Sequence, residues 1–270
     1  RADVPRAPGS LTALLGVNGK VRRLWRCLLA SELVKNLIDA GVHFGHRTSR
    51  WNPKMQPYIF GKRNLIHIID IRETVKGILR AKKFLTDVTA KGQDILFVGT
   101  KRQARNAVIH AALETGMHYV AERWLGGTLT NFRTIRSRLA RLEELEAIEQ
   151  EGMEQAYSKK MVSTLTRELK KIRRNLEGIR RMTRIPGALV IVDVKREHIA
   201  AKEARKLRIP VVAIIDTDSD PDQVDIPIPA NDDAMRAIEL ILGTLAEAVK
   251  EGKAARPEEK DEAPEGAGGP

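Results

Sequence analysis

The chain has 270 residues, of which 42% are hydrophobic, and this is enough apolar material for one sizeable core. Its formal net charge is +12 at pH 7. The single cysteine, Cys27, excludes an internal disulfide and every cysteine-based zinc motif, and it favours a reducing compartment. No apolar run approaches the roughly 20 residues that a membrane-spanning helix needs, so we expect no membrane partner.

The charge is unevenly distributed along the chain. Residues 1–184 carry a formal net charge of +19, whereas residues 185–270 carry −7. This asymmetry predicts a polyanion on the basic side, and nucleic acid is the expected one because each neutralised phosphate releases condensed counterions. Aromatic residues make up only 4% of the chain. Contacts to phosphates and to the shape of folded RNA are therefore favoured over bases stacked on aromatic rings.

Residues 1–30 are rich in arginine and predict a flexible basic extension, with an organelle transit peptide as the alternative. After them, short apolar runs alternate with helical stretches. Such runs are typical of parallel strands buried on both faces, and we expect these strands at residues 65–70, 94–99, 118–122, 188–193 and 210–216. We expect helices at residues 72–89, 101–115, 197–207 and 232–250. The alternation predicts an α/β domain, flavodoxin-like or Rossmann-like, with a doubly wound parallel sheet of about five strands.

This α/β domain comprises residues 31–132 and 185–250, and residues 133–184 interrupt it with two amphipathic stretches. Apolar residues recur in steps of three and four from Leu139 to Ile148 and again from Met161 to Met182. A polar segment separates the two stripes, so we expect an inserted antiparallel hairpin, a coiled coil, whose stripes bury only against each other. Residues 251–270 lack periodicity and are predicted to be disordered.

Two segments near strand ends are candidates for anion binding or for a structural junction. Residues 98–105 (VGTKRQAR) join a strand to a helix, and free N–H groups there favour an anion. They contain neither GxxxxGK[ST] nor GxGxxG, the two phosphate-binding fingerprints. Residues 123–132 (RWLGGTLTNF) contain two glycines that permit a sharp turn and Asn131, which can cap a helix. We interpret this second segment as the junction that sets the angle of the hairpin.

Acidic residues follow two of the expected strands. Asp193 and Asp216 end their strands, and parallel strands present their carboxyl ends at one edge of the sheet. The acidic loop 216–225 is not an EF-hand, because Pro221 stands where that calcium loop requires glycine. The two carboxylates can converge on a cation, with His46 of the HFGH motif completing the site. The alternative is a packed histidine and a loop that caps a helix through Asn231 and Asp232.

Four segments resemble the bacterial-type small ribosomal subunit protein two, the uS2 family: residues 40–70 (AGVHFGH…), 95–104 (ILFVGTKRQA), 122–132 (ERWLGGTLTNF) and 209–234 (IPVVAIIDTDSDP…). The resemblance extends over residues 31–250. It implies a flavodoxin-like domain with a protruding coiled-coil hairpin, and a structural, non-catalytic constituent of the 30S subunit. Such a protein is held on 16S rRNA between head and body near the mRNA exit.

The resemblance also implies partners. It implies other 30S proteins, among them protein one, which family members help to anchor, and the neighbours three, five and eight. It implies no homo-oligomer and a cytoplasmic location in the ribosome, or an organelle ribosome if residues 1–30 are a transit peptide. The competing hypotheses are a flavodoxin-type or Rossmann-type nucleotide-binding enzyme with the hairpin as a lid, and a free basic RNA chaperone.

Two sets of candidate site residues result. As rRNA-binding residues we expect basic side chains of the body and of the hairpin: Arg47, Arg50, Lys54, Lys62, Arg63, Lys101, Arg102, Arg133 and Arg136. No cofactor is required, but the resemblance implies positions that can hold a zinc ion: His46, Asp193 and Asp216. We predict no catalytic residue, because the sequence has no phosphate loop and no titratable pair in one crevice.

Overall fold

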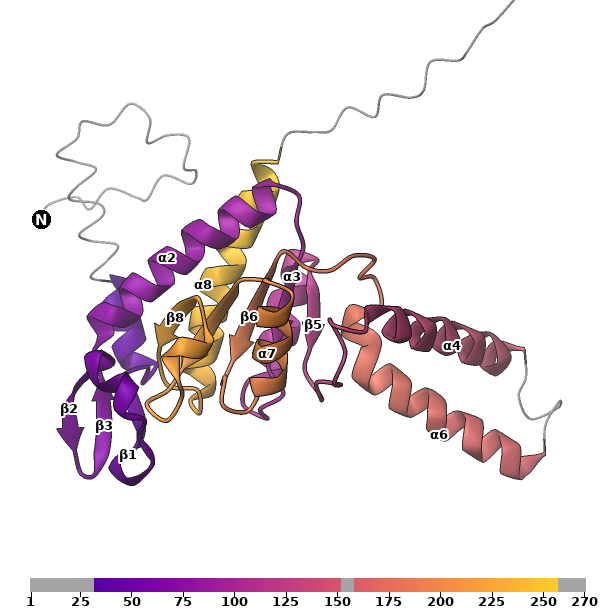
Figure 1. Cartoon of the computed structure of the whole chain (residues 1–270), viewed down its shortest axis with the longest axis horizontal. Helices are drawn as coiled ribbons and strands as arrows, with labels where there is room; N and C mark the ends of the chain where they lie inside the picture. Colours follow the sequence, from indigo (N-terminus) through magenta and orange to yellow (C-terminus); the bar gives the residue numbers. More distant parts are fainter. Residues whose placement is uncertain (1–31, 152–157, 257–270) are drawn as a thin grey trace, which may run out of the picture.

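The computed structural model describes residues 32–151 and 158–256 (Figure 1). The predicted extension at residues 1–30 and most of the predicted tail lie outside the described residues. The main sheet has five parallel strands in the order β5-β4-β6-β7-β8. Their bounds are β4 Ile95–Val98, β5 His118–Val120, β6 Ala188–Val192, β7 Val211–Ile215 and β8 Ile226–Pro229. The strand order reverses between β4 and β6, as in flavodoxin-like folds.

Helices cover both faces of this sheet. On one face lie α2 (Ile71–Ala90), α3 (Arg105–Thr115) and α8 (Met235–Ala254), and on the other lies α7 (His198–Lys206). Successive strand residues point to opposite faces. Phe97 therefore joins the core under the first three helices, whereas its neighbour Leu96 joins the core under α7. The predicted doubly wound α/β fold is confirmed.

The expected strand at residues 65–70 exists, but its assignment to the parallel sheet was wrong. β3 (Ile66–Ile69) pairs antiparallel with β1 (Phe44–Arg47) and with β2 (Ile59–Arg63) in a separate sheet of three strands. Between β2 and β3 stand only Asn64 and Leu65, both at positive φ. A two-residue turn can join only antiparallel strands, because parallel neighbours need a long crossover.

Sequence analysis missed β1 and β2 of the small sheet and, in the main sheet, β8, which lies at the edge next to β7. Its sequence is IPIP, and Pro227 and Pro229 cannot donate to a sheet ladder. An edge strand tolerates such prolines, because its outer side needs no partner. Two short 3-10 helices follow β1, η2 (Thr48–Arg50) and η3 (Pro53–Tyr58), and η5 (Pro221–Gln223) precedes β8.

Two helices are inserted between β5 and β6, namely α4 (Phe132–Gln150) and α6 (Lys159–Leu176), followed by η4 (Glu177–Ile179). They extend away from the β5 edge of the sheet (Figure 1). A small core of their own joins them, formed by Leu142, Leu145, Leu165 and Leu169. Nearer the sheet, however, the same stripes join the core of the body through Leu139, Leu176, Ile179 and Met182. The expectation that the stripes bury only against each other was therefore wrong at the root, and the coiled-coil geometry stays a prediction.

Two predicted helix boundaries differ from the structure by four residues. α3 begins at Arg105 rather than 101, because the preceding residues form a turn in which the Ala104 N–H donates to the Lys101 carbonyl. α8 continues to Ala254, so the first residues of the predicted disordered tail belong to a helix. Among the described helices, none has the length and apolar character that crossing a membrane requires.

Candidate nucleic-acid interface and cation site

A buried carboxylate organises the junction between the sheet and the inserted helices. Glu203 of α7 is only 8% exposed. It accepts hydrogen bonds from the backbone N–H groups of Gly127 (2.7 Å), Leu129 (3.0 Å) and Thr130 (3.1 Å). The Thr130 hydroxyl (3.1 Å) and the Trp124 indole Nε1 (3.2 Å) donate to it as well. The loop that leads into α4 is therefore wrapped around one negative charge.

Burial of the Glu203 carboxyl would raise its pKa, but the surrounding N–H donors stabilise the charged form more strongly, and the pKa is lowered. Sequence analysis identified the loop but missed this residue. The available signal was a glutamate on the buried, alanine-rich face of α7, beside Ala200 and Ala204. Asn131 does stand at the N-cap position, yet its side chain accepts from the Thr134 hydroxyl (2.9 Å) rather than from a helix N–H.

The crevice in which flavodoxin-like folds bind nucleotides lies at the carboxyl ends of β4 and β6. At this edge the protein's own side chains bind the donor groups of Thr100. Glu197, 3% exposed, accepts from the Thr100 backbone N–H (3.1 Å) and from the Thr100 hydroxyl. Arg196 Nε donates to the same hydroxyl oxygen (3.0 Å). This arrangement argues against the nucleotide-binding enzyme.

A candidate cation site lies at the same edge of the sheet. The Nδ1 of His46 is 2.8 Å from the Asp216 carboxylate, and one ligand atom from each of His46, Asp216 and Asp232 lies within 4.8 Å of the others. The predicted third ligand, Asp193, is not in this group, and its carboxylate lies 3.8 Å from the Lys101 ammonium. Asp232 follows β8, and it escaped prediction as a ligand because that strand was missed.

Lys101 belongs to the acidic cluster rather than to an open surface. Its side chain is 13% exposed, and Nζ lies 2.8 Å from Asp232 and 2.6 Å from Asp233. Burial, together with the charges of Asp216 and Asp193, raises the pKa of Asp232 to about 7. A hydrogen bond to Asp216 outweighs burial and raises the pKa of His46 to about 9. Because carboxylates already neutralise the Lys101 ammonium, we do not propose it as a phosphate contact.

The remaining predicted rRNA-binding residues are all exposed, but they come from separate elements: Arg47, Arg50, Lys54, Lys62, Arg63, Arg102, Arg133 and Arg136. Arg47 and Arg50 line a cavity of about 650 Å³ beside the cation site. Lys54 is held in ion pairs with Asp222 (2.6 Å) and Asp220 (3.1 Å), and these raise its pKa. Arg133 and Arg136 stand on α4, so the set spans the body and the insertion.

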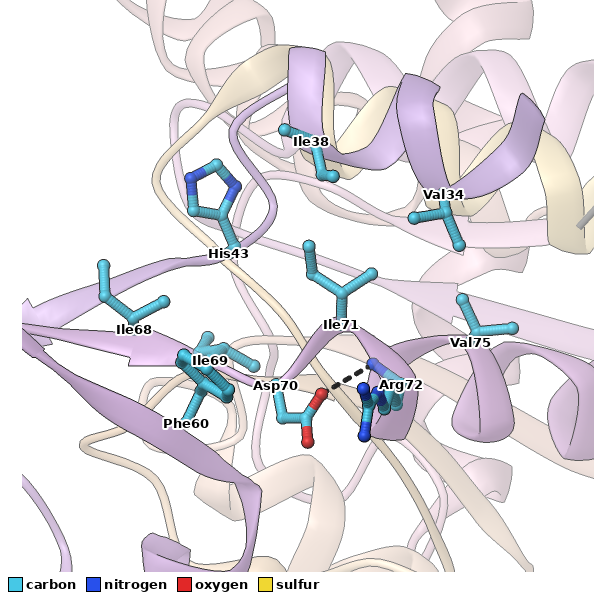
Figure 2. Close-up of a pocket in the computed structure, with 10 residues that line it drawn as sticks. All are labelled: Val34, Ile38, His43, Phe60, Ile68, Ile69, Asp70, Ile71, Arg72 and Val75. Carbon is cyan, nitrogen blue, oxygen red and sulfur yellow. Dashed lines mark hydrogen bonds between the residues drawn. The ribbon is translucent and has the colours of Figure 1, made fainter. Parts of the chain in front are cut away.

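Sequence analysis also missed an apolar groove between the helix at residues 32–39 and the start of α2 (Figure 2). Its cavity measures about 630 Å³ and is lined largely by apolar side chains from both sides. Phe60 is 79% exposed and Ile38 is 44% exposed, and both line it. The Asp70 carboxylate and Arg72 mark its polar edge, where the Arg72 N–H donates to Asp70 (2.9 Å). Exposed apolar surface of this kind marks an interaction site.

A flavodoxin-like body whose Thr100 donors are bound by its own Glu197, with exposed basic side chains and an inserted helical pair, has the features of a structural protein rather than of a nucleotide-binding enzyme. The family model described as ribosomal protein S2 matches residues 37–252. The chain is 62% identical over 225 residues to the small ribosomal subunit protein uS2 of Rhodopirellula baltica, an alignment that covers 83% of this chain and 86% of that protein.

Two further relatives bear the same name. The protein of Acidothermus cellulolyticus is 54% identical over 229 residues, covering 84% of this chain and 83% of that protein. The protein of Mycobacterium ulcerans is 53% identical over 228 residues, covering 84% and 83%. The chain belongs to the ribosomal protein S2 family, and it is a structural protein rather than an enzyme.

The substitution Glu203→Gln should lower the free energy of unfolding by about 2 kcal/mol at neutral pH, because an amide NH₂ would face N–H donors and leave some of them unpaired. Urea denaturation of the purified protein measures this change. The matched control is Glu143→Gln, an exposed glutamate of α4, which should leave the free energy of unfolding nearly unchanged.

Wild type and Glu203→Gln should also differ in how the free energy of unfolding depends on pH. Because the pKa of Glu203 is lower in the folded state than its ordinary value of 4.5, its stabilisation is complete above that value and is lost as pH falls through the lower folded pKa. On acidification, wild type should therefore lose more stability than Glu203→Gln. Parallel losses in the two proteins would contradict the assigned role.

Proposed function

We propose that the chain is a structural constituent of the small ribosomal subunit in the cytoplasm, held on 16S rRNA between head and body near the mRNA exit. Membership of the ribosomal protein S2 family over residues 37–252 is the observation that carries this proposal. The neighbours expected there are proteins three, five and eight. The formal net charge of +12 supports an rRNA partner, because basic proteins gain affinity by releasing counterions from phosphates.

The exposed arginines and lysines of the body and of α4 contact phosphates and so fix position and orientation without reading base sequence. Residues 185–250, which hold eight basic and twelve acidic residues, face solvent or a protein partner rather than the rRNA, because their carboxylates repel phosphates. The insertion extends the contact beyond the sheet, since Arg133 and Arg136 lie on α4. The protein thereby braces two separate parts of the folded RNA.

The salt dependence of binding to purified 16S rRNA tests this proposal. If six to ten phosphates are engaged, affinity should fall by roughly 10³ to 10⁵ between 50 and 200 mM salt. The double variant Arg47→Gln, Arg50→Gln should lower the slope of log affinity against log salt by about 2. Lys83→Gln, on the exposed face of α2, is the control and should leave the slope unchanged. A salt-independent affinity of the wild type would contradict the proposal.

We further propose that the apolar groove takes part in anchoring ribosomal protein one. The support is the groove itself, with about 630 Å³ of apolar-lined space and Phe60 79% exposed at its wall. An aromatic ring at such a position becomes a binding hot spot when a partner's apolar side chains cover it. Asp70 and Arg72 at the rim supply polar contacts that orient the partner.

The substitution Phe60→Ala should weaken binding of purified protein one by about tenfold or more, the loss expected of a hot-spot aromatic. Leu79→Ala is the control, because Leu79 is 57% exposed on α2 and does not line the groove. Surface plasmon resonance with the immobilised full chain measures both. Equal affinities of wild type and Phe60→Ala would remove the groove from the anchoring surface.

Zinc binding at the edge of the sheet is the second candidate function, and His46, Asp216 and Asp232 would hold the ion. One imidazole nitrogen and two carboxylate oxygens form a donor set that suits zinc, and the fourth position stays open for water or a partner's ligand. The burial of Asp216 and Asp232, each 1% exposed, also favours a charge partner over water. Lys101 supplies that charge when no metal is bound.

Competition of the purified chain with a chromophoric zinc chelator tests this site. Wild type should bind about one zinc per chain, and His46→Asn should bind none, because a site of three protein ligands does not survive the loss of its imidazole. His110→Asn, which changes an exposed histidine of α3, should behave as wild type. Zinc binding that His46→Asn leaves intact would exclude these ligands.

A further inference from the structure

A basic cleft lies at the root of α6, outside every residue assigned so far. Its cavity measures about 420 Å³ and lies between the start of α3, the end of β5 and the inserted helix α6. Glu122 is the one acid among its lining residues. Five basic side chains also line it: Arg105, Arg123, Lys170, Lys171 and Arg174. The cleft therefore concentrates positive charge where the body meets the insertion.

Glu122 fixes two of these cations in place. One of its carboxylate oxygens accepts from Arg105 Nη1 (3.1 Å), and the other accepts from Arg174 Nε (2.9 Å) and Nη2 (2.7 Å). Arg105 comes from α3 and Arg174 from α6, so this carboxylate ties the insertion to the body. It neutralises only one of the five positive charges, and the cleft keeps a positive potential.

The other three cations have no internal partner. The side chains of Arg123, Lys170 and Lys171 make no hydrogen bond or ion pair with any residue in the described part of the chain. These three exposed cations, gathered in one cleft, create a positive potential that attracts an anion. Asn175, which also lines the cleft, adds an amide N–H₂ donor. The lining therefore matches an anion with several acceptor oxygens.

A second cavity adjoins the first. This cavity measures about 370 Å³, shares Lys171 and Asn175 with the first, and continues along α6 to Arg138 of α4. Its floor includes Leu125, Ile172 and Leu176, and no aromatic ring lines either cavity. Its charged lining residues are Arg138, Lys171 and the acid Glu168, and Glu168 also lies 3.8 Å from Arg141, so the lining keeps a net positive charge. The two cavities in series fit successive phosphates of one strand, and the absence of an aromatic ring from both linings disfavours base stacking.

We propose that this root cleft, the two cavities on either side of Lys171 and Asn175, binds consecutive phosphates of an RNA backbone. The inference rests on the proposed rRNA-binding function and names a site within it. A lone inorganic phosphate would fill only one of the cavities. An acidic protein segment would supply carboxylates instead of phosphates, and lysine acetylation of the complex separates it from RNA.

The test compares two double variants of α6 in the full chain: Lys170→Gln, Lys171→Gln in the root cleft, and Lys159→Gln, Lys160→Gln at the exposed start of the same helix. Binding to purified 16S rRNA is measured across salt concentrations. The cleft variant should lower the slope of log affinity against log salt by about 2, since two phosphate contacts are lost. The control variant should keep the wild-type slope. Equal slopes in all three proteins, or an equal loss in both variants, overturn the proposal.

Lysine acetylation of the wild-type chain gives an independent readout that no substitution can disturb. In the complex with 16S rRNA, Lys170 and Lys171 should be protected while Lys159 and Lys160 stay reactive. Reactive cleft lysines in a complex that still forms overturn the cleft and leave the proposed function standing, and this is also the outcome expected if the cleft takes an acidic protein. A wild-type chain that binds no 16S rRNA at all refutes the proposed function itself.

Discussion

The carboxylate of Glu203 is the constraint on which the geometry of the molecule depends. The loop between β5 and α4 must leave the sheet and turn sharply, and it carries buried N–H groups that no strand or helix can satisfy. Each such group left without an acceptor would cost about 1–3 kcal/mol. Glu203 accepts from three of them and from the Trp124 indole, while Gly127 at φ +90° permits the turn.

Two further contacts hold the insertion beside this junction. Glu122 joins Arg105 of the body to Arg174 of α6. Gly178 lies against the carbonyl oxygen of Tyr119 in β5, where any Cβ would collide with the backbone. Because the root is fixed at these points, the cations of α4 and α6 keep a defined position relative to those of the body. A fixed arrangement matters for RNA binding, since phosphates of folded RNA are themselves fixed in space.

The sequence predicted the fold class because buried parallel strands have a strong pattern. The runs at β4, β6 and β7 are apolar on both faces, and each was found within a residue or two. The run at residues 65–70 has the same composition, and only the two-residue turn at Asn64 and Leu65 reveals that it is antiparallel. β8 was missed because its two prolines argue against a strand, although an edge strand tolerates them.

The candidate site was predictable only in part, for a related reason. His46 and Asp216 stood in conspicuous motifs, and the structure brings them together. Asp232 and Glu203 are single acids, and their roles depend on neighbours that are distant in the sequence. Asp232 is placed by β8, which was not predicted, and Glu203 contacts a loop more than 70 residues away in the sequence. For Lys101 the sequence shows the positive charge, but it does not show that Asp232 and Asp233 pair with that charge in the folded protein.

Membership of the ribosomal protein S2 family carries the proposal that this chain is a structural part of the small ribosomal subunit. Sedimentation of the native protein through a sucrose gradient at high salt tests it most directly. We expect the chain to migrate with 30S particles, because protein neighbours and the folded rRNA hold it in place even where salt weakens each phosphate contact. A chain that stays at the top of the gradient, while other small-subunit proteins migrate with the particle, would contradict it.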